Sequence, residues 1–90
     1  MLIRSQDKKR ITTDLNLEIL HESWDSKEWE IGNNAVGVIG KYSTEEKAIK
    51  VLDMIQNAYV DYQYSKWVGY ERETVIDCIF EMPQDEEVKV

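Results

Sequence analysis

Two side chains of this chain, His21 and Cys78, are of the types that carry out nucleophilic catalysis or bind transition metals. A cysteine acts as a nucleophile when a nearby histidine takes its proton. The thiol needs a positive, partly exposed environment to become a thiolate, and Asp77 precedes Cys78 directly. Structural zinc takes four nitrogen or sulfur ligands, but the chain has one histidine and one cysteine. The sequence therefore predicts no catalytic residue and no metal site.

Carboxylates and glycines are the other residue types with chemical potential. The chain has 18 acidic residues, so carboxylates come close by chance, and no spacing marks two of them as acid and base. The glycines are not arranged as a phosphate-binding loop, because no glycine–lysine–serine/threonine run follows them. Gly37 and Gly40 fit better as strand positions that another group approaches closely. We expect a protein that is not an enzyme, binds no cofactor and has no identified small-molecule substrate.

The net charge of −7 limits the class of partner. Nucleic-acid binding draws most of its affinity from basic residues that neutralise phosphates, and an acidic chain is equally unsuited to anionic membranes. We therefore expect neither partner. The first ten residues carry a local excess of positive charge and the last ten of negative charge, which favours contact between the two ends. The alternative is an acidic, phage-type inhibitor that mimics nucleic acid and blocks a DNA- or RNA-binding protein.

Cysteine usage and hydropathy indicate a cytoplasmic setting. A single cysteine allows no intramolecular disulfide, which fits a reducing compartment. The N-terminal residues "MLIRSQDKKR" have charge where a signal peptide has an apolar run. The longest uncharged apolar stretch, "AVGVIG", is far short of the roughly 20 residues that span a bilayer.

The elements that must position any site begin with β-structure in residues 1–42. Five β-like runs can be read there: "MLIRS", "RITT", "LNLEIL", "KEWEI" and "AVGVIGKY". In the third run Leu15, Leu17 and Ile19 alternate with polar residues, so they share one face of a strand. "QDKK" and "GNN" separate neighbouring runs and are typical of tight turns. The pattern predicts a meander of up to five short strands.

Two tryptophans flank the segment "DSKE" between the third and fourth runs. If Ser26 and Lys27 form the tip of a tight turn, Trp24 and Trp29 lie directly across from each other. A facing aromatic pair stabilises a hairpin by roughly 0.2–1 kcal/mol, which accounts for the spacing without a ligand. The other interpretation is an exposed pair that marks an interface.

A helix is predicted over residues 43–62. "STEE" forms a capping box in which Ser43 caps the first turn and Glu46 reaches back. An apolar stripe follows at helical spacing: Ala48, Val51, Leu52, Ile55, Ala58, Tyr59 and Tyr62, widened by Ile49 and Met54. The stripe is wider than a surface helix needs. Either the helix packs deeply into a curved sheet, or one flank of it contacts a second subunit.

A C-terminal strand is predicted in "TVIDCIFEM", whose residues alternate and which Pro83 ends. Cys78, Phe80 and Met82 share the inward face, so Cys78 is expected to be a small core residue. Residues 63–73 allow no assignment. The fold predicted is α+β: a curved antiparallel β-meander of about five to six strands, one long helix packed on it, and a C-terminal strand. Residues 1–83 form one domain, and residues 84–90 a frayed acidic tail.

Three segments resemble a known family: "MLIRSQDKK", "GKYSTEEKAIKVLDMIQNAY" and "FEMPQDEE". The family consists of short uncharacterised proteins of Gram-positive bacteria and their phages. The resemblance covers about half of the chain and is most distinctive in the middle and final segments. It implies a β-meander, then a helix, then a short strand, in a cytoplasmic protein, and it implies no activity.

Binding to a protein partner is the function that the composition favours. Three tryptophans and five tyrosines are many for 90 residues, and both types are enriched at interface hot spots. A domain this small has difficulty burying all of them, although half or more could fill its core. The candidate partner-binding residues are Tyr59, Tyr62, Trp67, Trp24 and Trp29. We expect a protein–protein interaction module that self-associates into a homo-oligomer.

Overall fold

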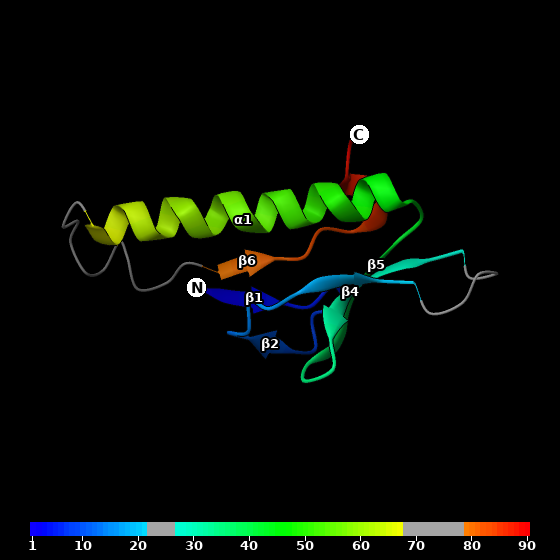
Figure 1. The fold of residues 1–90 in the computed structure, drawn as a ribbon, viewed down its shortest axis with the longest axis horizontal. Helices are drawn as coiled ribbons and strands as arrows, with labels where there is room; N and C mark the ends of the chain where they lie inside the picture. The colour runs from blue at the N-terminus through cyan, green and yellow to red at the C-terminus, as the bar shows by residue number, and fades with distance from the viewer. Residues whose placement is uncertain (22–26, 68–78) are drawn as a thin grey trace.

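The computed structural model describes residues 1–21, 27–67 and 79–90, and the side chains of all of these except residues 65–67 (Figure 1). The elements are β1 (Leu2–Arg4), β2 (Ile11–Thr12), β3 (Glu18–Leu20), β4 (Trp29–Asn33), β5 (Gly37–Tyr42), α1 (Glu45–Trp67), β6 (Ile79–Glu81) and a 3₁₀ turn, η1 (Asp85–Glu87). The predicted α+β class, the long helix and the C-terminal strand are confirmed.

The strands form two three-stranded sheets, in the orders β2-β1-β6 and β3-β4-β5. Each sheet contains antiparallel neighbours that are close in sequence. The exception is β6, which lies parallel to β1 with Phe80 opposite Ile3. A parallel neighbour requires a long crossover connection, and α1 lies within that crossover. The two ends of the chain therefore meet in one sheet (Figure 1).

The connection between β1 and β2 joins the two sheets. The backbone N–H of Gln6 donates to the carbonyl of Ile39, at 2.8 Å. The guanidinium of Arg10 donates to the carbonyl of Val36, at 2.6 Å, and to that of Val38. These bonds occupy backbone carbonyls of the β4–β5 hairpin that a further strand would otherwise pair with. The meander is interrupted here and becomes two sheets.

The core lies between α1 and the sheets. Its buried hydrophobic members in the described chain are Ile3, Ile31, Ile39, Tyr42, Ala48, Val51, Ile55, Met82 and Val88. The helix packs on β3, β4 and β5. Ala48, Val51 and Ile55 form the centre of the predicted stripe and are buried, whereas Ile49 and Tyr59 at its edge are exposed. The predicted alternation of the C-terminal strand is confirmed over residues 79–82, because Phe80 is half-buried and Met82 is buried while the residues between and before them are exposed.

Both ends of α1 differ from the prediction. The hydroxyl of Thr44 accepts the backbone N–H of Lys47, at 3.1 Å, so Thr44 is the cap and the predicted Ser43–Glu46 capping box is wrong. Ser43 is instead bonded to Asp85, which the local pattern could not reveal. The helix continues to Trp67, beyond the predicted end at residue 62, because neither glycine nor proline interrupts it before Gly69.

Gly40 occupies a strand position where a side chain would collide with the core, as the sequence predicts. A Cβ atom there would lie 2.8 Å from Cε of Met82 and 3.0 Å from the ring of Tyr42. The Met82 side chain can shift, but the Tyr42 ring is buried and its hydroxyl donates to the carbonyl of Pro83, at 2.8 Å. Burial also raises the pKa of the Tyr42 hydroxyl, which keeps it protonated as a donor.

Gly40→Ala is expected to destabilise the protein by about 1–3 kcal/mol, because overpacking forces neighbours off their preferred rotamers. Urea unfolding of the variant measures this. In a double-mutant cycle with Met82→Ala, the cost of Gly40→Ala should shrink, since one of the colliding groups is gone. An equal cost in both backgrounds would show that Met82 does not limit the space at Gly40.

Candidate interaction surface

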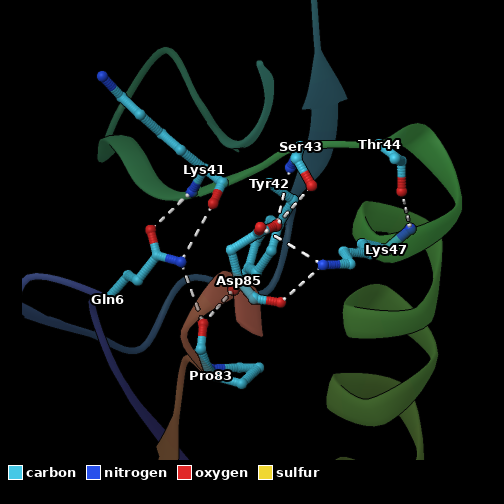
Figure 2. A network of polar contacts seen from close by, with 8 residues as sticks. All are labelled: Gln6, Lys41, Tyr42, Ser43, Thr44, Lys47, Pro83 and Asp85. Atoms are coloured by element: carbon cyan, nitrogen blue, oxygen red, sulfur yellow. Dashed lines mark hydrogen bonds and ion pairs between the residues drawn. The ribbon is translucent and has the colours of Figure 1, made fainter. Parts of the chain in front are cut away.

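Polar side chains of mixed type gather where α1 begins, and they include Asp85, the first residue of η1 (Figure 2). The cluster contains a serine, a lysine and an aspartate, which are types that can catalyse acyl transfer. The Ser43 hydroxyl donates to Oδ1 of Asp85, at 3.1 Å, and the Ser43 backbone N–H donates to the same atom, at 2.8 Å. Nζ of Lys47 donates to the Asp85 carbonyl, at 3.0 Å, and lies 3.4 Å from Oδ2. Ser43 and Lys47 are thus both paired with Asp85.

This cluster anchors the C-terminal segment. The Gln6 amide donates to the carbonyls of Lys41 and Pro83, each at 3.1 Å. The Gln84 amide donates to the carbonyl of Gln6, at 2.9 Å. Val88 then enters the core with 4% of its surface exposed. The expectation of a frayed tail is wrong from Gln84 to Val88, because long-range bonds and one buried side chain hold the segment.

The Asp85 carboxylate gives the anchor a dependence on pH. The backbone N–H of Ser43, helped by its hydroxyl and by Lys47, holds the pKa of Asp85 below its ordinary value of 3.8. A carboxylate with a lowered pKa stabilises the folded state above its ordinary pKa. That stabilisation is lost as pH falls through the folded-state pKa.

We expect wild type to be more stable than Asp85→Asn at pH 7 and the difference to shrink below about pH 4. Urea unfolding of both proteins from pH 7 to pH 3 measures it. Asp7, whose pKa the Ser5 hydroxyl also lowers, is common to both proteins and cancels in the comparison. A difference in stability that does not change with pH would mean that the Asp85 charge does not contribute.

Trp29 has a ring partner that the sequence did not predict. In the β3–β4 ladder Leu20 lies opposite Glu30, so the register continues to His21 opposite Trp29. The two rings are stacked, with centroids 3.9 Å apart and planes 5° from parallel. The predicted facing of Trp24 and Trp29 depends on Trp24, which lies outside the described residues.

A groove of about 420 Å³ lies between α1 and the segment before β3. Its lining is largely apolar and comprises Leu15, Leu17, Leu52, Ile55, Gln56 and Tyr59; it is called the α1–β3 groove below. Leu15 is 39% exposed and Tyr59 is 37% exposed. The groove is therefore an open apolar surface beside the core.

Further apolar side chains continue this surface along α1. The exposed flank of α1 consists of Ile49, Gln56, Tyr59, Val60, Gln63 and Tyr64. Val60 is 55% exposed and Tyr64 is 62% exposed. The amide of Gln63 donates to the hydroxyl of Tyr59, at 2.8 Å, which restrains that tyrosine at the rim of the groove. The C-terminal turns of α1 extend past strands β1 and β6 (Figure 1).

The exposed flank of α1 is uncharged only in its C-terminal part, because Asp53, seven residues before Val60, is exposed on the same side of the helix. Between Gln56 and Tyr64 the only charged residue is Asp61. At roughly 100° per residue, Asp61 lies about 100° around the helix from Val60. Groups can therefore approach this part of the helix without burying an unpaired charge.

Charges elsewhere on the described surface are interspersed. Ion pairs join Lys8 to Glu81 at 3.3 Å, Lys41 to Glu30 at 4.0 Å, and Lys47 to Asp85. A nucleic-acid mimic needs carboxylates in rows along one face. The mixed layout gives that alternative no specific support, and it stays a hypothesis.

Comparisons with protein-family models, curated proteins and solved structures return no match. Among residues 1–21, 27–67 and 79–90, no group of three or more histidine, cysteine or acidic side chains is placed to hold a metal ion. Cys78 lies outside these residues. No helix in the part of the chain that the structure describes is long and apolar enough to cross a membrane.

The five candidate partner-binding residues are placed differently from one another. Tyr59 lines the α1–β3 groove. Tyr62 is half-buried, on the side of α1 that carries the buried stripe. Trp29 is half-buried against the core and His21. Trp67 is the last residue of α1, and its side chain lies outside the described part of the structure. Trp24 lies outside the described residues altogether. Among the three candidates whose side chains the structure describes, Tyr59 is the one that lines the groove.

Sequence reasoning missed the most exposed members of the surface. The predicted stripe does not include Val60, and the alternation predicts that Leu15 shares a strand face with Leu17 and Ile19. The available signal was the position of Val60: an apolar residue that lies outside the buried stripe of a helix has no core to enter. Tyr64 lies one turn further along the same flank.

Proposed function

We propose that this protein is an interaction module that self-associates through the exposed flank of α1 and the adjoining α1–β3 groove. It acts by binding rather than by chemistry. The observation that carries the proposal is the exposure of Val60 and Tyr64 on an uncharged helix flank beside an open apolar groove. A contiguous apolar surface of this kind is typical of interaction sites.

The size and chemistry of the surface suit a stable interface. A helix of 23 residues is about 35 Å long, and standard interfaces bury about 800 Å² on each partner. Tyrosine supplies large contact area with few rotatable bonds, and it is enriched among residues whose truncation costs the most affinity. Here Tyr59 is already restrained by Gln63, which reduces the entropy lost on binding.

Charge favours a second copy as the partner. A basic partner would be selected by carboxylates, and between Gln56 and Tyr64 the flank has a single acidic residue, Asp61. Two copies that each carry −7 repel each other, so they associate best through a surface without charge. The flank between Gln56 and Tyr64 meets that condition.

The test is the mass of the full chain in solution as a function of concentration and salt. A multiple of 10.6 kDa in native mass spectrometry or sedimentation supports self-association. Added salt screens the repulsion between like-charged copies and should strengthen association, whereas it would weaken binding of an acidic mimic to a basic partner. Stable dimers usually have dissociation constants well below about 100 µM, so a protein that is still monomeric at that concentration would contradict the proposal.

A further inference from the structure

We propose, resting on the self-association proposed above, that two copies pair through antiparallel α1 helices about a two-fold axis between Tyr59 and Val60. In this arrangement Gln56 of each copy lies opposite Gln63 of the other. Tyr59 and Val60 of one copy pack on Val60 and Tyr59 of the other.

The first argument is a seven-residue repeat on the exposed flank of α1. Ile49, Gln56 and Gln63 recur every seven positions, and Leu52 and Tyr59 fall between them. This is the spacing of the a and d positions at which two helices pack along a common seam. The buried stripe of α1 centres on Val51 and Ile55. The repeat is therefore a second seam, beside the one that contacts the sheets.

The second argument comes from the two glutamines in this seam. A polar residue at an a position specifies register and orientation, since it is satisfied only when its partner lies opposite. In an antiparallel pair, a two-fold axis between Tyr59 and Val60 brings Gln56 opposite Gln63 twice. Primary amides both donate and accept, so each Gln56–Gln63 pair can hydrogen-bond. Gln63 keeps its carbonyl and one N–H after it donates to Tyr59.

The third argument is the distribution of charge along the helix. A parallel pair would place Glu45 and Glu46 of one copy beside the same residues of the other, at helix ends of the same sign. In the antiparallel pair the two copies of Glu45 are about 44 Å apart along the helix axis, from 29 residues at 1.5 Å each. The helix dipoles then oppose each other, which is favourable.

The fourth argument is steric. The described strands lie along the N-terminal part of α1, and the C-terminal turns extend past β1 and β6 (Figure 1). Parallel helices would bring the sheets of the two copies side by side at the same height. Antiparallel pairing centred on Tyr59 and Val60 displaces the sheets of the two copies in opposite directions along the helix axis.

Charge exchange in the seam tests the orientation. Gln56→Glu combined with Gln63→Lys keeps the net charge at −7, as does the reverse pair, Gln56→Lys with Gln63→Glu. Antiparallel helices place opposite charges together in both variants, and we expect dissociation constants within about tenfold of wild type. Parallel helices would place like charges together and weaken both variants by about tenfold or more, which would overturn the inference.

Cross-linking gives a second measurement that does not depend on affinity. In a Cys78→Ser background, Gln56→Cys and Gln63→Cys proteins are each oxidised alone and after equimolar mixing. We expect a disulfide-linked dimer mainly in the mixture. Cross-linking of each protein with itself would instead indicate parallel helices, in a protein that still self-associates. A wild type that stays monomeric by mass would contradict the proposed function itself, so the two failures are distinguishable.

Discussion

Val60→Asp is expected to convert the self-associated protein to monomer at concentrations where wild type is oligomeric. Val60 lies in the middle of the uncharged part of the exposed flank of α1, and 55% of it is exposed in a single copy. Association would bury an aspartate at this position on each copy without an ion-pair partner. Burial of an unpaired charge costs several kcal/mol, so a loss of about 100-fold or more in association constant is expected.

The same substitution should leave the fold of a single copy nearly unchanged. Val60 contributes little to the core, and valine and aspartate have similar helix propensities. Sedimentation across a concentration series measures association, and urea unfolding at a concentration where wild type is dissociated measures the stability of the monomer. The separation matters because loss of association alone lowers the melting temperature by mass action.

Lys50→Gln is the matched control for Val60→Asp. Both changes take the net charge from −7 to −8, and both alter an exposed position of α1. Lys50 lies outside the exposed flank, so its substitution should leave association close to that of wild type. Equal weakening by both variants would mean that net charge, and not this surface, controls association.

Deletion of residues 84–90 is expected to destabilise the domain by at least about 3 kcal/mol. Val88 is 4% exposed, and burial of a valine side chain contributes roughly 1.5–3 kcal/mol. The deletion also removes the Asp85 carboxylate that accepts the Ser43 N–H, and the Gln84 amide that donates to Gln6. A small domain has only about 5–15 kcal/mol of stability, so the melting temperature should fall by more than about 12 °C.

Shorter changes separate the contributions of the segment. Deletion of Lys89 and Val90 alone removes two exposed residues and should have little effect. Val88→Ala retains the polar anchor and should cost part of the full loss. A truncated protein that ends at Pro83 and melts with wild type would show that the C-terminal segment is dispensable for stability.

The α+β class and the long helix followed from local patterns alone. Alternation in the β-like runs marks strands with one buried face, and an apolar stripe at helical spacing marks a helix that packs on them. The same reasoning correctly placed Gly40 where a side chain approaches and Phe80 and Met82 on the inward side. These features depend on the period at which side chains return to one face of a helix or strand, and the order of polar and apolar residues along the sequence shows that period.

Contacts between distant residues required the tertiary structure. The parallel pairing of β1 with β6 joins residues nearly 80 positions apart, and no local pattern encodes it. Ser43 is hydrogen-bonded to Asp85, and Thr44 caps the helix in its place. In the β3–β4 ladder Ile19 lies opposite Ile31, and in this register the ring of Trp29 stacks on the ring of His21.

For the proposed surface, the sequence determined that tyrosines are abundant, that α1 is amphipathic and that few charges lie on its second half. It left open which flank of an over-wide apolar stripe is covered. The tertiary structure decided that Val51 and Ile55 are buried by the sheets while Ile49 and Tyr59, at the edge of the stripe, are left exposed. The physical reason is that burial depends on which side of the helix the sheets cover, and strands far away in sequence determine that side.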